Sequence, residues 1–99
     1  MVNYDRVVIK PSTIKGKKLT AIFYEKNKKK KTTHFGAKGM SDFTINKDEE
    51  RKKRYLSRHR AREDWNSPTT AGALSRWILW NKKTKSASIR DFKNRFKIK

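Results

Sequence analysis

The stretch DEERKKRYLSRHRAREDW, from Asp48 to Trp65, decides how the rest of the chain is interpreted. Read with a helical period, it places Tyr55, Leu56 and His59 on one narrow face, and lysines and arginines cover the remainder. Its opening acidic residues suit the positive end of a helix dipole. The pattern predicts a helix that docks on a core through a thin seam and presents a wide cationic surface.

The composition indicates one small folded domain over residues 1–99. Only 33% of the chain is hydrophobic, but three Trp, three Tyr and five Phe residues can supply a core because each buries a large area. The formal net charge is +19, and such an excess destabilises a compact chain through self-repulsion. We therefore expect a polyanionic partner: nucleic acid first, then an anionic membrane surface or an acidic protein.

The absence of cysteine excludes disulfides and thiolate metal sites. The N-terminus lacks the apolar run of a signal peptide, and no stretch approaches the ~18 apolar residues that a transmembrane helix needs. We expect a protein that is not secreted and has no transmembrane segment.

The first third of the chain reads as β-structure. The β-branched run Arg6–Ile9 is an expected strand, and Leu19–Glu25, apolar on both faces, is an expected central strand. The lysine-rich run Asn27–Lys31 suits a hairpin loop, and Lys31–Phe35 would be the returning strand. A small antiparallel sheet of two or three strands is predicted.

Three helices are expected after a loop. The first is the cationic stretch, with Asn46 as its N-cap; the second runs from Pro68 to about Trp80 behind an N-cap at Ser67. The third begins behind Ser88, where Asp91 three residues later resembles a capping box.

The predicted fold is therefore α+β, a small antiparallel N-terminal β-sheet followed by three α-helices around one aromatic core. The expected segments are a β-sheet region at about 4–35, a loop at 36–46 and a three-helix region at 47–97. The expected core residues are Val8, Leu19, Ala21, Phe23, Phe43, Leu56, Leu74, Trp77, Ile78 and Phe92.

Lysine and arginine side chains spread along the chain suit sequence-independent phosphate contact. On the helix, Arg54, Arg58 and Arg62 would form a row that fits either a major groove or a phosphate backbone, and we favour the backbone. The expected nucleic-acid contacts are Arg51, Lys52, Arg54, Arg58, Arg60 and Arg62, with Lys28, Lys29, Lys30 and Lys31 as a second clamp and Lys82 and Lys83 in a connector.

Trp77 and Trp80, three residues apart, are either core and rim or a surface patch for a protein partner. The two histidines, His34 and His59, show no recognised ligand or catalytic spacing, so a structural role is favoured over a metal-dependent nuclease. We expect no enzymatic activity, and we assign no catalytic, cofactor-binding or metal-binding residue.

Three blocks carry a resemblance to a known family: HFGAKGMSDFT (34–44), ERKKRYLSRHRAREDW (50–65) and TAGALSRWILWNK (70–82). Together they resemble small basic proteins of unknown function encoded by nucleocytoplasmic large DNA viruses, including viruses of algae and amoebae. The chain departs from the family at Asn81-Lys82-Lys83, where a proline often follows the Asn-Lys pair. The resemblance implies a viral setting and supplies no catalytic residues.

The expected function is non-enzymatic, largely sequence-independent binding of double-stranded DNA, by a protein located in the virion or in the nucleus or cytoplasm of the infected host. One alternative is a minor capsid or scaffold protein that binds acidic capsid proteins through Trp77, Trp80 and the Gly36–Gly39 loop. RNA is another possible partner, because phosphate contacts do not by themselves distinguish it from DNA. The oligomeric state is left open.

Overall fold

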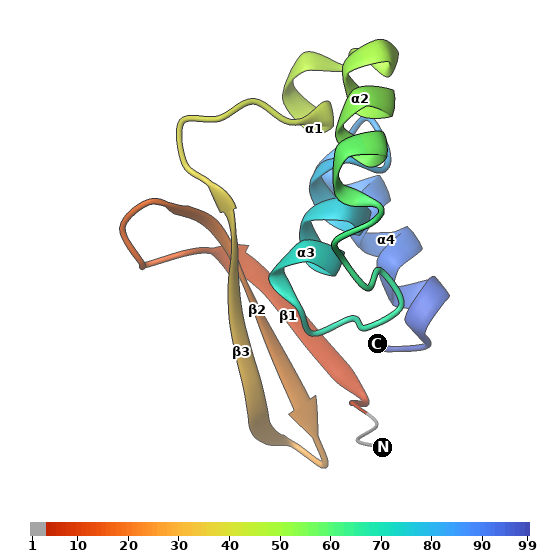
Figure 1. Ribbon diagram of the computed structural model, residues 1–99. Helices are drawn as coiled ribbons and strands as arrows, with labels where there is room; N and C mark the ends of the chain where they lie inside the picture. Colours follow the sequence, from red (N-terminus) through yellow and green to blue (C-terminus); the bar gives the residue numbers. More distant parts are fainter. Residues whose placement is uncertain (1–3) are drawn as a thin grey trace.

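The computed structural model describes residues 4–99, with a three-stranded antiparallel sheet followed by helices. In chain order the strands are β1 (Arg6–Pro11), β2 (Lys17–Glu25) and β3 (Lys28–Ala37). The α-helices are α1 (Phe43–Asn46), α2 (Glu49–His59), α3 (Ala71–Leu74) and α4 (Lys85–Phe96), and the π-helix η1 (Ser75–Leu79) follows α3. The helices gather on one side of the sheet (Figure 1). None of those in residues 4–99 is long and apolar enough to cross a membrane.

The sheet has β2 at its centre, as its two apolar faces predict. Ala21 and Phe23 of β2 are completely buried, and Val7 of β1 lies opposite Phe23 and is buried with it. Because successive side chains of a strand point to opposite faces, burial of Val7 places Val8 on the other face. The prediction of Val8 as a core residue is therefore wrong by one residue.

The lysine run forms a strand instead of the predicted loop. Lys26 and Asn27 both have positive φ, 52° and 65°, which is the backbone of a two-residue type I′ hairpin turn. The turn is tight enough for β3 to begin at Lys28, and the Asp5 carboxylate accepts a hydrogen bond from the Lys26 backbone N–H. The four lysines thus lie on an edge strand.

The segment predicted as a loop contains a fourth α-helix, so the expectation of three helices is too low. Asp42 caps α1 by accepting a hydrogen bond from the Thr44 backbone N–H, and Lys47 ends the helix in the left-handed conformation. A single helical turn has no periodic pattern, so the sequence indicates its buried Phe43 but not the helix itself.

Helix α2 is shorter than predicted. Its N-cap is Asp48, whose carboxylate accepts hydrogen bonds from two backbone N–H groups of the first turn, and Asn46 is instead the last residue of α1. The helix ends at His59, so the following arginines lie in a turn. The predicted seam is present, since Tyr55 is buried and Leu56 and His59 are partly buried.

The second predicted helix begins later than expected and changes its winding. α3 starts behind Thr70, whose hydroxyl accepts a hydrogen bond from the Ala73 backbone N–H, and Ser67 is not its cap. In η1 the Trp80 backbone N–H donates to the carbonyl of Ser75, five residues back. The wider turn rotates Leu79 and Trp80 into the core, and Trp77, a predicted core residue, is only partly buried.

The N-cap of helix α4 lies four residues before the predicted cap, Ser88. Thr84 is the N-cap, and its hydroxyl accepts a hydrogen bond from the Ala87 backbone N–H. Ser88 is completely buried, and its hydroxyl accepts a hydrogen bond from the Lys82 backbone N–H at 3.0 Å. Ser88 therefore fixes the connector before α4.

One cluster of buried residues joins the sheet to the helices. Leu56, a predicted core residue, is partly buried and packs against this cluster. Lys99 exchanges backbone hydrogen bonds with Asp5 and Val7, which holds the last residues of the chain beside β1. The cluster consists of Val7, Leu19, Ala21, Phe23, Phe35, Phe43, Tyr55, Leu74, Ile78, Leu79, Trp80, Phe92 and Ile98.

Candidate nucleic-acid interface

Two adjoining hollows open between the sheet and the helices. The first, which we call the lysine hollow, has a volume of about 520 Å³ and lies between the start of β2, α1 and the start of α4. The second, the arginine hollow, has a volume of about 400 Å³ and lies between α2, α3 and the end of β3. The two share the lining residues Lys17, Lys18, Asp42 and Leu79.

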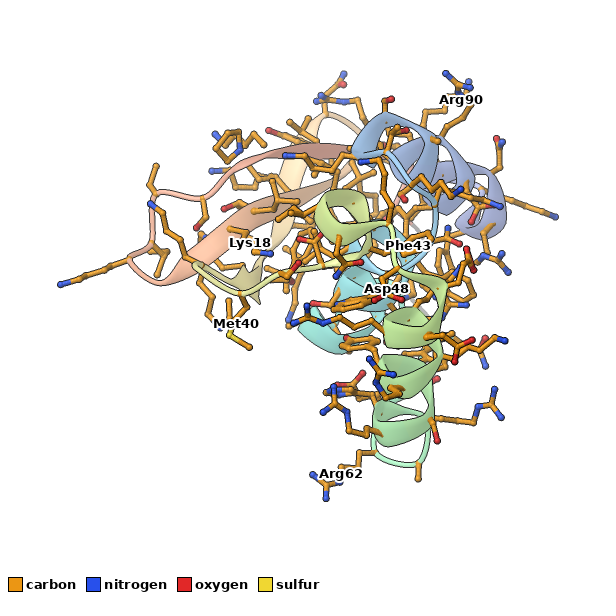
Figure 2. All side chains as sticks on the ribbon, turned by 90° about the horizontal axis from the view of Figure 1, so that it is seen from above. Lys18, Met40, Phe43, Asp48, Arg62 and Arg90 are labelled. Carbon is orange, nitrogen blue, oxygen red and sulfur yellow. The ribbon has the colours of Figure 1, made fainter. Side chains whose placement is uncertain are left out.

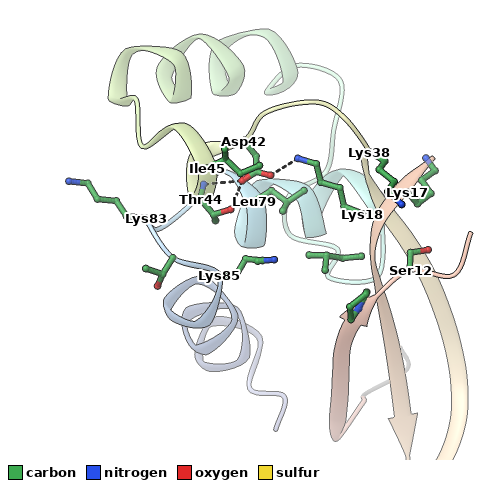
Figure 3. A pocket seen from close by; sticks show the side chains of 13 residues that line it. Ser12, Lys17, Lys18, Lys38, Asp42, Thr44, Ile45, Leu79, Lys83 and Lys85 are labelled. Carbon is green, nitrogen blue, oxygen red and sulfur yellow. Dashed lines mark hydrogen bonds and ion pairs between the residues drawn. The ribbon is translucent and has the colours of Figure 1, made fainter. Parts of the chain in front are cut away.

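Five lysines surround the lysine hollow. Lys18 and Lys85 point into it, whereas Lys17, Lys38 and Lys83 lie at its rim (Figure 3). They come from β2, from the loop after β3 and from both sides of the α4 N-cap, so only the folded chain brings them together.

The acidic residue of the lysine hollow is already fully engaged. Asp42 is almost completely buried, and one of its carboxylate oxygens lies 2.5 Å from the ammonium nitrogen of Lys18. Its other oxygen accepts hydrogen bonds from the backbone N–H and the hydroxyl of Thr44. Asp42 therefore neutralises Lys18 and leaves the other four lysines uncompensated.

The arginine hollow contains Arg51 and Arg58, which project from α2 on either side of the buried Tyr55. Its acidic residue Glu63 is also engaged: one oxygen lies 3.3 Å from Nδ1 of His59, and the other accepts a hydrogen bond from the indole N–H of Trp65. The arginines thus face the hollow without a carboxylate partner among residues 4–99.

Residues 7–59, more than half of the chain, match a family of unknown function designated DUF5754. The chain belongs to the DUF5754 family. No curated protein and no solved structure matches it. The DUF5754 match spans the three strands, α1 and α2, and therefore the arginines of α2 and the lysines of β2 that line the hollows.

The structure separates the expected helix contacts of this DUF5754 protein into groups. Arg51 and Arg58 line the arginine hollow, and Arg54 is exposed on the outer surface of α2. Arg60 and Arg62 lie beyond the end of α2, and Figure 2 shows Arg62 at the opposite end of the helix from Asp48. The predicted row of Arg54, Arg58 and Arg62 along one helix therefore does not form.

Lys52, one of the expected phosphate contacts, makes structural contacts within the protein. Its ammonium donates a hydrogen bond to the carbonyl of Asn81 at 2.7 Å and lies 4.8 Å from the centre of the Phe43 ring. Burial is the main reason that the pKa of Lys52 is lowered. This side chain ties α2 to the connector before α4.

The remaining expected lysines are divided between the two ends of the molecule. Lys82 and Lys83 are exposed in the connector before α4, and Lys83 lines the lysine hollow. Lys28–Lys31 are exposed at the β2–β3 hairpin, at the end of the molecule away from α2 (Figure 1). They do not clamp the same surface as the arginines.

Trp80 is buried and Trp77 is partly buried, which matches the interpretation of the pair as core and rim. Trp80 is only 8% exposed and stacks on Tyr55. Trp77 is partly buried, donates a hydrogen bond to the carbonyl of Trp65, and has the guanidinium groups of Arg76 and Arg95 4.1 and 3.8 Å from its ring centre. Both indole rings therefore contact other side chains of the same protein.

Arg76 is a basic residue that sequence reasoning did not single out. Burial, followed by the nearby charge of Arg95, lowers its pKa, and its guanidinium donates a hydrogen bond to the carbonyl of Trp80. Lys17, Lys18, Lys38 and Lys85 were also missed as site residues. Their place in one hollow follows from chain topology, for which the sequence contains no local signal.

Both histidines contact other side chains of the protein. Among residues 4–99, no group of three or more His, Asp or Glu side chains is arranged to hold a metal ion. His34 Nδ1 lies 2.9 Å from the hydroxyl of Ser12 and 2.8 Å from that of Thr20. These contacts join β2 and β3 to the residue that follows β1, on the face of the sheet that carries Val8.

Proposed function

We propose that this protein binds nucleic acid through phosphate contacts, without an enzymatic step and without strong sequence preference, and that duplex DNA is the favoured target. The observation that carries the proposal is the convergence of lysines and arginines from distant parts of the chain on two adjoining hollows. A polyanion placed there would relieve the repulsion among cations that no acidic residue of the hollows neutralises.

The pairing of the acids supports a phosphate partner. Asp42 is held by Lys18 and Thr44, and Glu63 by His59 and Trp65, so neither presents a free carboxylate that would repel a phosphate. Among residues 4–99, the lysines and arginines of the hollows other than Lys18 have no ion-pair partner that would orient their donors towards a base edge. This favours contacts independent of sequence.

The setting that we propose is viral, with the protein in the virion or in the infected cell. It is supported by the three sequence blocks that resemble proteins of nucleocytoplasmic large DNA viruses. A long viral genome requires charge neutralisation when it is condensed, and a small domain with a net charge of +19 would contribute to it. RNA could use the same phosphate contacts, and the experiment below compares duplex RNA with duplex DNA.

A second candidate function is a minor capsid or scaffold protein bound to an acidic capsid protein. It is favoured by exposed aliphatic side chains beside the basic hollows, since Met40 and Ile45 are each 62% exposed and line them. An acidic protein with apolar residues would cover both features, whereas a phosphate backbone covers only the charge.

The test is a salt titration of affinity for duplex DNA, single-stranded DNA, duplex RNA and heparin. In the double variant Arg51→Gln/Arg58→Gln, loss of two phosphate contacts should reduce the slope of log affinity against log salt by about 1.8 for duplex DNA. The matched control is Lys29→Gln/Lys30→Gln, which removes the same charge at the remote hairpin and should change the slope less.

Two results would overturn the proposal. Equal slopes for the two variants would mean that the charge acts without a defined site. Binding to heparin as tight as to any nucleic acid would direct attention to acidic capsid proteins instead.

A further inference from the structure

We propose that the lysine hollow is a binding site for a single nucleotide, with the phosphate on its lysines and the base against its apolar floor. This site rests on the proposed function, because it requires that phosphates bind to this surface. The expected ligand is a nucleoside phosphate, either free or at an unpaired end of a nucleic acid.

The charge of the hollow suits a compact anion. Lys85 points into it and forms no ion pair within residues 4–99, and Lys17, Lys38 and Lys83 at the rim are likewise unpaired there (Figure 3). The only carboxylate in the lining belongs to Asp42, which Lys18 neutralises. A phosphate beside Lys85 would therefore lie among several uncompensated lysines and meet no free acid.

The floor of the hollow suits a flat apolar group. Leu19 and Leu79 are buried residues whose side chains form part of the lining, and Pro11 and Ile45 contribute from either side. Ile45 is 62% exposed although it belongs to α1, so a helix residue that could contribute to the core faces the hollow instead. A nucleobase over this floor would remove the isoleucine from water.

The size of the hollow supports one nucleotide rather than a duplex. Its volume of about 520 Å³ lies within the ~300–1,000 Å³ of typical small-molecule sites. The Lys18–Asp42 ion pair, held by the hydrogen bonds of Thr44, fixes the wall towards the arginine hollow before a ligand arrives. Such a preorganised wall lowers the cost of binding.

The experiment compares three small ligands by isothermal titration calorimetry on the full chain: adenosine monophosphate, inorganic phosphate and adenosine. Adenosine monophosphate should bind about tenfold more tightly than either fragment, because only it uses both lysines and floor. The variant Ile45→Ser should lose about fivefold for adenosine monophosphate and leave phosphate binding unchanged. The variant Lys38→Gln/Lys85→Gln should weaken both phosphate-bearing ligands.

Matched controls keep the result interpretable. Ile14 is 49% exposed and lies outside the lining, so Ile14→Ser makes the same chemical change away from the hollow and should have no effect. Lys29→Gln/Lys30→Gln removes the same charge at the hairpin. Each of these positions is exposed, so the variants are expected to fold.

Competition separates the two sources of the nucleotide. A duplex with a single-stranded overhang that displaces adenosine monophosphate, when a blunt duplex does not, identifies a nucleic-acid end as the ligand. If neither duplex displaces adenosine monophosphate, the ligand is a free nucleotide. Either of these two results supports the site. Equal affinity for adenosine monophosphate and phosphate, no binding, or an effect of Ile14→Ser equal to that of Ile45→Ser would overturn it.

The outcomes distinguish this inference from the proposed function. Ile45→Ser removes no charge, so it should leave the salt dependence of blunt-duplex binding unchanged. Blunt-duplex binding without nucleotide binding overturns only the inference, and nucleotide binding without duplex binding overturns only the proposed function.

Discussion

The indole ring of Trp80 stacks face to face on the phenol ring of Tyr55, with ring centres 4.5 Å apart and planes 7° apart. This stack joins the end of η1 to the middle of α2. Tyr55 also stacks on the ring of His59, with ring centres 4.2 Å apart. The position of Arg51 and Arg58 relative to the sheet therefore depends on this aromatic contact.

Replacement of Trp80 should loosen α2 from the core. Trp80→Ala is expected to destabilise the fold by about 3–5 kcal/mol, because it removes a large buried ring and leaves a cavity. Urea unfolding followed by circular dichroism measures the change. Met40→Ala, at a mostly exposed aliphatic residue, is the control and should stay within about 0.5 kcal/mol of the wild type. Similar values for the two variants would contradict the role of the stack.

The same stack affects proton binding. Burial, with a further contribution from the negative charge of Glu63, raises the pKa of the Tyr55 phenol from its ordinary 10.0 to about 12. An ultraviolet titration of the folded protein should show a tyrosine ionising near pH 12, and Tyr55→Phe should remove that step. A titration with no such step would disprove the shift.

The sign of the accompanying stability change follows from linkage. Between pH 10 and pH 12 the unfolded chain loses the Tyr55 proton while the folded chain retains it. The contribution of this residue is thus fully present below pH 10 and disappears as the pH rises towards 12. Wild type should lose stability relative to Tyr55→Phe over this interval, and comparison of the two cancels the ionisation of the lysines.

Gly36, where β3 passes the hollows, is expected to tolerate a larger side chain poorly. It has φ +80°, and an added Cβ would lie 2.8 Å from Cδ1 of Leu79 and 3.2 Å from Cβ of Lys18. Gly36→Ala should therefore cost the strain of a positive φ and a steric clash, about 2–4 kcal/mol together. Gly39 has φ +90° and open space around it, so Gly39→Ala isolates the strain and should cost about 1–2 kcal/mol. Thermal unfolding of both variants tests the difference, and equal costs would exclude the clash.

Removal of the charge of Asp42 should change stability and binding in opposite directions. Asn is also a good N-cap, so Asp42→Asn retains an acceptor for Thr44 but abolishes the ion pair with Lys18. We expect a loss of about 1–3 kcal/mol of stability, because the pair is largely buried. The released Lys18 should raise the affinity for duplex DNA and steepen its salt dependence by up to about 0.9.

Asp64→Asn provides the matched control for that variant. Asp64 is exposed and accepts only a local hydrogen bond from the Asn66 backbone N–H, so the substitution makes the same charge change without breaking an ion pair. Urea unfolding and a salt titration apply to both variants. An equal gain in affinity would show that net charge, and not the release of Lys18, is responsible.

Much of the architecture could be predicted because it depends on local patterns. The antiparallel strands, the central position of β2 and the seam of α2 through Tyr55 all follow from periodicity and composition. The errors occurred where tertiary packing overrode a local signal. In β1 the core residue is Val7 instead of the predicted Val8, because Val7 lies opposite the buried Phe23 of β2. The π-turn at Ser75 rotates Trp80 into the core.

The amino-acid sequence by itself determined the large positive charge, the order of strands before helices and the absence of thiol chemistry. These properties depend on composition and on neighbouring residues. Only the tertiary structure decided that Lys17, Lys38 and Lys85 share a hollow, that Lys52 is held by Asn81, and that the lysines of β3 lie elsewhere. The physical reason is that electrostatic interactions act through space, so which charges act together is set by how the folded chain places distant segments.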